Sequence, residues 1–256
     1  MGVKIAIIGG TGVYDPSILE QIQEKTVETE FGSVPVKIGS LQNKEVAFIT
    51  RHGFEHSVPP HLINYRANIA ALKKLGVKSI FATAAVGSLN LDMKPGDLVL
   101  ADQFLDFTKV RQHTFFGVGR VVHLDMTVPY CADLRAELQK AAAKLKFSCH
   151  NGGTYVCTEG PRFETPAEIK MFALLGGDLV GMTSVPEVTL AREAEICYAT
   201  IAMVTNFAAG ISPTALTHQE VLEVMAENAV KLRQLLIETI SNLDPDRECI
   251  CQKALQ

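Results

Sequence analysis

The sequence predicts one α/β domain, and three observations support this fold class. Apolar runs of strand length recur along the chain without alternation, as expected for strands covered on both faces. Segments with apolar residues at helical spacing lie between these runs. No repeat, low-complexity segment or linker interrupts the order, so residues 1–245 are expected to form one domain, followed by a polar tail over 246–256.

The individual elements follow from these patterns. Continuous apolar runs predict strands at Lys4–Ile8, Val46–Thr50, Ser79–Ala85, Asp97–Leu100, Thr154–Cys157, Leu179–Met182 and Cys197–Thr205. Helical spacing of apolar residues predicts helices across Ile63–Leu75, Leu134–Leu145 and Ile169–Leu175. Pro186 and Glu187 indicate the start of another helix.

The last helix has the clearest start. Thr217 and Glu220 have the spacing of a capping box, and the apolar face that follows extends to Ile240. The stretch Thr108–Thr127, rich in Gly, Phe and His, has no periodicity. We expect it to be a loop that reaches a site or a partner subunit.

Composition excludes several classes of partner. The chain has 256 residues, 47% hydrophobic and 20% charged, with a formal net charge of −4. This balance predicts neither nucleic acid nor a membrane as partner. The apolar run at residues 3–8 is too short for a signal peptide or a membrane span, so we interpret it as the first strand of a cytoplasmic protein.

The six cysteines fall into two groups. Four stand singly in apolar surroundings and are expected to be reduced core residues: Cys131, Cys149, Cys157 and Cys197. Cys249 and Cys251 lie in the polar tail and are expected to be exposed thiols, with a redox-labile pair or a disulfide as alternatives. No second pair or His cluster follows, which argues against zinc.

Asn206 and Glu164 predict a binding pocket. Asn206 ends the apolar run 201–205, where a buried strand opens onto a cleft. An unpaired buried amide costs on the order of 1–3 kcal/mol, so Asn206 has a local backbone partner or a ligand. With the acceptor Glu164, it suggests a site for a flat heterocycle that carries both donors and acceptors.

Two turns at strand ends suggest an anion site. Gly9-Gly10-Thr11-Gly12 follows the first strand, and its N–H groups can bind an anion, although a plain tight turn is equally consistent. Arg51 and His52 follow the next apolar run, where both are expected to donate to phosphate, with a surface Arg as the alternative. Arg51-His52-Gly53 also matches the start of the histidine-phosphatase signature, but there the motif follows the first strand.

Three histidines fall close together in the sequence: His52, His56 and His61. Pro59-Pro60 prevents a regular helix across them, so no metal is expected.

The turn 160–166 precedes a predicted helix. Phe163 can stack on a ring and Glu164 can accept its N–H groups, while Thr165 and Glu168 form a capping box for the helix that follows.

Five motifs in order resemble the signatures of the trimeric purine nucleoside phosphorylase and methylthioadenosine phosphorylase family, from about residue 4 to 240. They are Gly9-Gly10-Thr11-Gly12, Arg51-His52-Gly53, Ala85-Val86-Gly87-Ser88, Glu159-Gly160-Pro161-Arg162-Phe163-Glu164-Thr165 and Gly181-Met182-Thr183-Ser184-Val185-Pro186-Glu187. The resemblance implies a central mixed, partly barrel-like β-sheet flanked by α-helices. It also implies a purine-salvage transferase in which orthophosphate attacks the anomeric carbon of a purine nucleoside, without metal or organic cofactor. Assembly as a homotrimer or a hexamer (a dimer of trimers) is implied too.

The resemblance assigns roles residue by residue. Phosphate would be bound by Thr11, Arg51, His52, Ala84, Ala85 and Thr183. The base would contact Phe163, Glu164, Thr205, Asn206, Phe207 and Ala208. The ribose would contact Met182, His218 and His56, with His123 supplied by the neighbouring subunit. Arg51, His52 and Asn206 would be catalytic, Asn206 by stabilising the departing purine anion while phosphate captures an oxocarbenium-like sugar.

Three positions distinguish the substrates within that family. Methylthioadenosine phosphorylases carry Asp, Ser and a small apolar residue where this chain has Asn206, Glu164 and His218. Asn206 can donate to O6, Glu164 can accept N1–H, and His218 can bond a 5′-hydroxyl, so inosine and guanosine are favoured. Methylthioinosine or methylthioadenosine phosphorylase activity is the alternative. A histidine-type phosphatase using His52 and a nucleotide-binding module without activity are more remote hypotheses.

Overall fold

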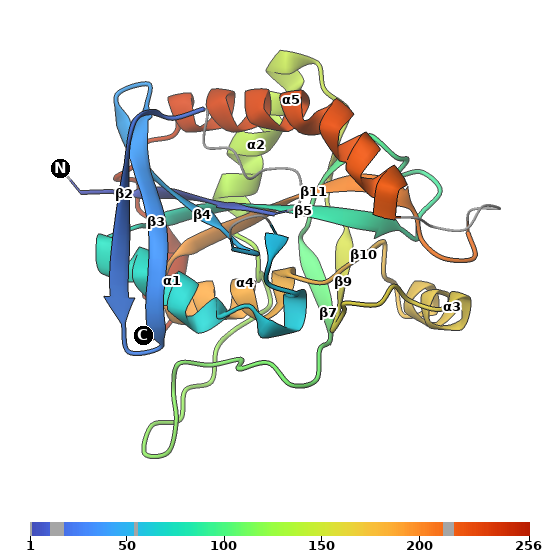
Figure 1. Ribbon diagram of the computed structural model, residues 1–256, viewed down its shortest axis with the longest axis horizontal. Coiled ribbons are helices and arrows are strands. Elements are labelled where there is room, and N and C mark those ends of the chain that lie inside the picture. The colour runs from blue at the N-terminus through green and yellow to red at the C-terminus, as the bar shows by residue number, and fades with distance from the viewer. Residues whose placement is uncertain (1, 11–17, 54–55, 212–217) are drawn as a thin grey trace.

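The computed structural model describes residues 2–10, 18–53, 56–211 and 218–256, without the side chains of 218–222 and 227. The described part confirms the α/β fold, with one mixed sheet between helices (Figure 1). Its strands are β1 Ile5–Gly9, β2 Glu20–Thr29, β3 Gly32–Leu41, β4 Lys44–Thr50, β5 Ser79–Ser88, β6 Leu98–Leu100, β7 Gln103–Phe107, β8 Cys149–Asn151, β9 Thr154–Thr158, β10 Leu179–Gly181 and β11 Cys197–Phe207. Its helices are α1 Tyr65–Leu75, α2 Ala132–Leu145, α3 Pro166–Leu174, α4 Ser184–Glu193 and α5 His218–Asn242, with short 3₁₀ helices at Pro60–Leu62 and Ile250–Lys253.

The sheet branches at β5. The main path runs β2-β3-β4-β1-β5-β10-β9-β7. β5 also pairs along its whole length with β11, in parallel, while its last two residues pair antiparallel with β10. β11 in turn pairs antiparallel with β6, which pairs with β8. A strand with three neighbours lets the sheet fold over on itself, which agrees with the mixed, partly barrel-like sheet expected from the resemblance.

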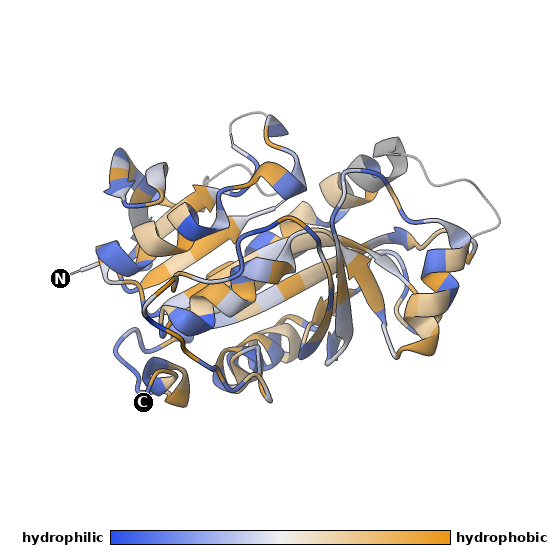
Figure 2. Cartoon of the chain, turned by 90° about the horizontal axis from the view of Figure 1, so that it is seen from below, coloured by the Kyte–Doolittle hydropathy of each residue, from blue (hydrophilic) through white to orange (hydrophobic). Residues whose placement is uncertain are grey.

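Helices cover both faces of the sheet. In Figure 1, α2 and α5 lie across one face, while α1 and α4 lie against the other. Each face has its own apolar core: one contains residues of α1 and α4, and the other contains residues of α2 and α5. Figure 2 shows the orange strands enclosed between helices whose outward positions are mostly blue. Burial on both faces explains why the central strands are continuous apolar runs.

All seven predicted strands are present, but β2, β3, β7 and β8 were not predicted. β2 has the sequence EQIQEKTVET, and within it only Val27 is buried. It is an edge strand of a hairpin with β3, so its polar residues meet solvent and give no apolar run. The stretch 108–127 contains no helix or strand, as predicted.

Two helix caps were predicted from the sequence, and the structure describes one of them. The capping box of α3 is present, with Thr165 accepting from the Glu168 backbone N–H and Glu168 accepting from that of Thr165. For α5, the expected cap Thr217 lies outside the described residues.

The prediction of two exposed thiols in the tail is wrong for Cys251. The segment after α5 turns back onto the body, and Cys251, in the 3₁₀ helix 250–253, is 4% exposed. Cys249 is half-buried and also packs against the α2 and α5 core. The tail is polar in composition, but both of its cysteines pack against the core of α2 and α5. This contact could not be predicted from the sequence pattern.

Among the described residues, no helix is both long enough and apolar enough to cross a membrane.

Candidate active site

A cavity of about 370 Å³ lies at the carboxyl ends of the parallel strands. Gly10 follows β1, Arg51 follows β4, and the last residues of β5 and β11 form the floor. Ligands of open α/β sheets bind at this edge because the loops that follow parallel strands converge there. Twelve predicted site residues line the cavity: Arg51, His52, His56, Ala84, Ala85, Phe163, Glu164, Met182, Thr183, Thr205, Asn206 and Ala208.

Four predicted residues are not seen in the cavity. Phe207 belongs to β11 but does not line it, because it alternates with Asn206 and Ala208, which do. His123 is exposed in the long loop and contributes nothing to the cavity of its own chain. Thr11 and the side chain of His218 lie outside the described residues.

Arg51 forms the charged wall of the cavity. Its Nε and Nη2 donate to the two carboxylate oxygens of Glu187, both at 2.7 Å, and its Nη1 donates to the Thr83 carbonyl at 2.8 Å. The Arg51 and Glu187 side chains are 1% and 0% exposed. A guanidinium has five N–H groups, and the described residues accept three of them, which leaves one on Nη1 and one on Nη2 for a ligand.

Gly10 permits this arrangement. A Cβ at this position would lie 2.4 Å from the Thr83 carbonyl oxygen and 2.7 Å from Arg51 Nη1, so only glycine fits. Glu187 was part of a quoted motif but was not predicted as the partner of Arg51, since the two lie 136 positions apart.

His52 is a neutral imidazole with a defined tautomer. Its Nδ1 lies 2.9 Å from the Val58 carbonyl, which can only accept, so the proton is on Nδ1 and the Nε2 lone pair is left as an acceptor. Burial, and then the charge of Arg51, lowers the pKa of His52 to about 4. The ring stacks on His56, with centroids 4.2 Å apart. In this form His52 accepts from a ligand O–H, whereas the sequence suggested a donor.

The lowered pKa of His52 predicts acid sensitivity. Its unfolded value is about 6.5, so the unfolded chain binds the proton first as the pH falls. The free energy of unfolding is therefore expected to fall by roughly 3 kcal/mol between pH 7 and pH 4 on account of this group. His52→Gln should remove that part of the loss, as measured by denaturant unfolding at both pH values; equal losses in both proteins would contradict it.

Asn206 has local partners and one N–H to spare. Its Oδ1 accepts from the Thr205 hydroxyl at 2.7 Å, and its Nδ2 donates to the Phe207 carbonyl at 2.9 Å. The register of β11 against β5 shifts between Val204 and Asn206. This irregularity turns both Thr205 and Asn206 toward the cavity. The second N–H of the amide has no acceptor among the described residues, and the Phe207 carbonyl, which can only accept, fixes which end of the amide carries the N–H groups.

Glu164 and Phe163 form the opposite wall. The Thr158 hydroxyl donates to Glu164 Oε1 at 2.6 Å, which leaves Oε2 as an acceptor. Burial raises the pKa of the Glu164 carboxyl, although the Thr158 hydrogen bond opposes the shift. Phe163 lines the cavity while 41% exposed, so one part of its ring surface is available to a planar ligand.

Sequence reasoning missed Arg111, which positions the cavity walls. Its guanidinium is buried and donates to four backbone carbonyls, those of Thr158, Glu159, Met182 and Val185. These residues follow β9 and β10, the strands that carry the Glu164 turn and Thr183. Arg111 lies in the aperiodic loop, where no pattern distinguishes a buried Arg from a solvated one.

The site thus unites a guanidinium and small residues at one end with an amide, a carboxylate and an aromatic ring at the other. This combination defines an enzyme site for an anion and a polar heteroaromatic ring. Residues 4–241 match the model of the phosphorylase superfamily.

Relatives and solved structures agree with that match. A probable 6-oxopurine nucleoside phosphorylase of Dictyoglomus turgidum is 57% identical, over 99% of this chain and 97% of its own. The 6-oxopurine nucleoside phosphorylase of Pyrococcus furiosus is 51% identical, over 99% and 98%. The crystal structure of a methylthioadenosine phosphorylase from an Antarctic soil metagenomic library has a TM-score of 0.91 and 39% identity, covering 99% of this chain and 91% of that one. The chain belongs to the phosphorylase superfamily.

Proposed function

We propose that the chain catalyses phosphorolysis of 6-oxopurine nucleosides, inosine and guanosine, to the free base and ribose 1-phosphate. The observation that carries the proposal is the placement of Asn206 and Glu164 in one cavity with Arg51. A donor amide and an acceptor carboxylate complement O6 and N1–H of a 6-oxopurine. The relatives named 6-oxopurine nucleoside phosphorylases, at 57% and 51% identity, support the same substrate class.

The phosphate is expected at the Arg51 end. Two guanidinium N–H groups are without an acceptor among the described residues, and Thr183 lines the same cavity. HPO₄²⁻ keeps one proton, and the neutral His52 offers the lone pair that can accept it. Ala84 and Ala85 are small enough to let the anion approach the end of β5. Thr11 stays a predicted ligand of the phosphate.

The base is expected between Phe163 and the end of β11. Asn206 Nδ2 would donate to O6, and Glu164 would accept N1–H and, for guanosine, an N–H of the 2-amino group. Gly87 keeps this space open, since a Cβ there would lie 3.2 Å from both Asn206 Nδ2 and Val180 Cγ1. Adenine has no hydrogen on N1 and would leave Glu164 unpaired, which gives discrimination.

In the proposed reaction, the bond from the sugar C1′ to purine N9 breaks and its electron pair moves into the purine. A phosphate oxygen then forms the new bond at C1′ with inversion. Asn206 stabilises the charge that builds up on the leaving base, an effect worth about 10²–10³ in rate for comparable donors. Met182 and His56 also line the cavity, and the ribose is expected to contact them. The reaction uses orthophosphate as co-substrate and needs neither metal nor organic cofactor.

A substrate panel tests the proposal. Inosine, guanosine, methylthioinosine, adenosine and methylthioadenosine are assayed with and without phosphate. We expect phosphate-dependent release of base from inosine and guanosine. Turnover of methylthioadenosine without inosine would overturn the proposal, and release of base without phosphate would indicate a hydrolase. Turnover of methylthioinosine would support the alternative, a substrate with a 5′-methylthio group. His218 argues against this group because an imidazole can bond a 5′-hydroxyl. The likeness to a solved methylthioadenosine phosphorylase favours it.

Glu164→Gln is expected to lower kcat/KM for inosine about 10–100-fold, because the amide presents either a weaker acceptor or a donor to N1–H. The effect on kcat/KM for phosphate at saturating nucleoside should be small. Steady-state kinetics on both substrates measures the difference. A uniform loss on both would show that Glu164 does not contact the base.

The assembly is proposed to be a homotrimer or a dimer of trimers in the cytoplasm. The loop that contains His123 projects from the body (Figure 1), and it exposes the apolar side chains of Val118 and Val121. Contact with a second copy would bury these valines and bring His123 to the ribose of the neighbouring site. Light scattering that gives a monomeric mass would contradict this assembly.

A further inference from the structure

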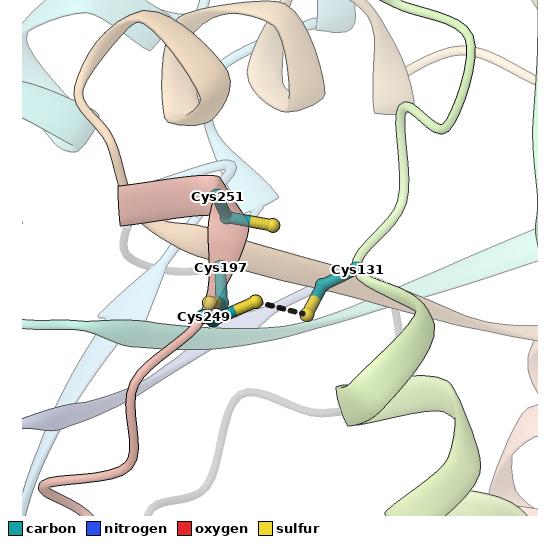
Figure 3. Close-up of side chains that lie close together, drawn as sticks. All are labelled: Cys131, Cys197, Cys249 and Cys251. Atoms are coloured by element: carbon teal, nitrogen blue, oxygen red, sulfur yellow. Dashed lines mark hydrogen bonds between the residues drawn. The ribbon is translucent and has the colours of Figure 1, made fainter. Parts of the chain in front are cut away.

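Four cysteines from three distant parts of the chain meet at one point. Cys131 precedes α2, Cys197 opens β11, and Cys249 and Cys251 come from the C-terminal segment (Figure 3). Their four sulfur atoms all lie within 4.8 Å of one another. Three of the four are buried, and Cys249 is half-buried. In the sequence, Cys131 and Cys197 stand singly in apolar surroundings, so neither could be recognised as a partner of the pair in the tail.

The sulfur positions suit a tetrahedral cation. A zinc–thiolate bond is about 2.3 Å long, so tetrahedral geometry places the sulfurs about 3.8 Å apart. Cys131 Sγ and Cys249 Sγ are 3.7 Å apart. A set of four cysteine ligands is typical of closed structural zinc sites.

Two arginines contact the cluster, and one of them, Arg192, indicates that it carries negative charge. Arg192 is 8% exposed, and its Nη1 donates to Cys251 Sγ at 3.3 Å. Among the described residues, Arg192 has no carboxylate within ion-pair distance, and its Nε is buried without a partner. Arg247 donates to Cys131 Sγ at 3.5 Å but also pairs with the Asp133 carboxylate at 3.0 Å, so Arg192 alone depends on the sulfurs for an anion. A buried guanidinium needs an anion, and two neutral disulfides would leave Arg192 without one.

We propose that, in the reduced protein, Cys131, Cys197, Cys249 and Cys251 bind one thiophilic divalent cation of the zinc class. The four thiols lose their protons on binding, and four thiolates around a divalent cation keep two negative charges, which face Arg192 and Arg247. Because the ligands come from β11, the start of α2 and the tail, the bound cation fastens residues 246–256 to the body.

The proposed site is separate from the catalytic cavity. Cys197 and Asn206 stand at opposite ends of β11, nine residues apart, which corresponds to about 30 Å. The cation is therefore expected to raise stability and to leave the chemistry of the cavity unchanged.

Metal titration of the full chain tests the proposal. Protein purified under anaerobic, reducing conditions is freed of metal with a chelator and titrated with Co²⁺, whose thiolate complexes absorb strongly, and then with Zn²⁺. We expect one equivalent per chain, displacement of Co²⁺ by Zn²⁺, and a rise in Tm of several degrees with Zn²⁺. Cys251→Ser should lose tight binding and the rise in Tm but keep phosphorolysis. Cys149→Ser, which changes a thiol outside the cluster, should behave as wild type.

Three results would overturn the proposal. The first is a reduced wild-type chain that binds no Zn²⁺ or Co²⁺ in equimolar amount. The second is anaerobically purified protein in which the four cysteines are already paired as disulfides. The third is binding in Cys251→Ser that equals that of wild type. If Cys251→Ser does not fold, the half-buried Cys249→Ser replaces it with the same expected losses.

Discussion

Asn206→Asp is expected to lower kcat/KM for inosine about 100-fold and to give measurable use of adenosine or methylthioadenosine. A carboxylate at this position accepts hydrogen bonds only, so it faces O6 and the developing negative charge of a 6-oxopurine unfavourably. The same carboxylate can accept from a 6-amino group. The Thr205 hydroxyl, which now donates to Asn206 Oδ1 at 2.7 Å, can donate equally to an aspartate and hold it in place.

The measurement is the ratio of kcat/KM for inosine and adenosine in wild type and variant. Thr205→Val serves as the matched control, because it leaves the amide intact but removes the hydroxyl that donates to its oxygen. It should lower inosine use without admitting adenosine. An Asn206→Asp enzyme with unchanged selectivity would show that Asn206 does not contact the base.

Arg51→Met is expected to abolish phosphate-dependent turnover and also to destabilise the fold by about 3–5 kcal/mol, because it leaves the Glu187 carboxylate buried without its cation. Glu187 is 0% exposed, and its remaining polar contact among the described side chains is the Tyr198 hydroxyl at 2.6 Å. The two effects arise from different partners of Arg51, so they can be separated.

The double variant Arg51→Met/Glu187→Leu separates them. Replacing a buried ion pair by apolar side chains of similar volume is often neutral for stability. We expect Tm to return toward wild type while phosphorolysis stays lost. Thermal unfolding and phosphate-dependent turnover of both variants give the answer. A stable double variant that recovers activity would contradict the assignment of Arg51 to the phosphate.

Much of the cavity could be predicted from the sequence because its residues lie at strand ends within short motifs. Arg51 follows β4, Asn206 is the penultimate residue of β11, and Glu164 precedes the capping box of α3. The end of a strand can be recognised in the sequence where an apolar run stops. Because the carboxyl ends of parallel strands lie at one edge of a sheet, these polar side chains could be assigned to that edge. Arg111 could not be found in this way, since its partners are backbone carbonyls and leave no signature in the sequence.

The protonation of His52 also needed the structure. The sequence places an imidazole beside a guanidinium, and both were expected to donate to phosphate. The contact with the Val58 carbonyl fixes the proton on Nδ1, and burial holds the pKa near 4, so the ring accepts. The tautomer of His52 depends on the backbone carbonyl of Val58, six positions away, so the identity of the Val58 side chain does not predict it.

The sequence by itself determined the fold class, the α/β order of the central elements and twelve of the residues that line the cavity, because periodicity, strand ends and short motifs are local properties of the chain. Only the tertiary structure decided which charges are paired and which cysteines meet. Glu187 reaches Arg51 across 136 positions, and Cys249 reaches Cys131 across 118. Contacts at such separations depend on how strands and the tail pack in space, and composition and spacing carry no record of them.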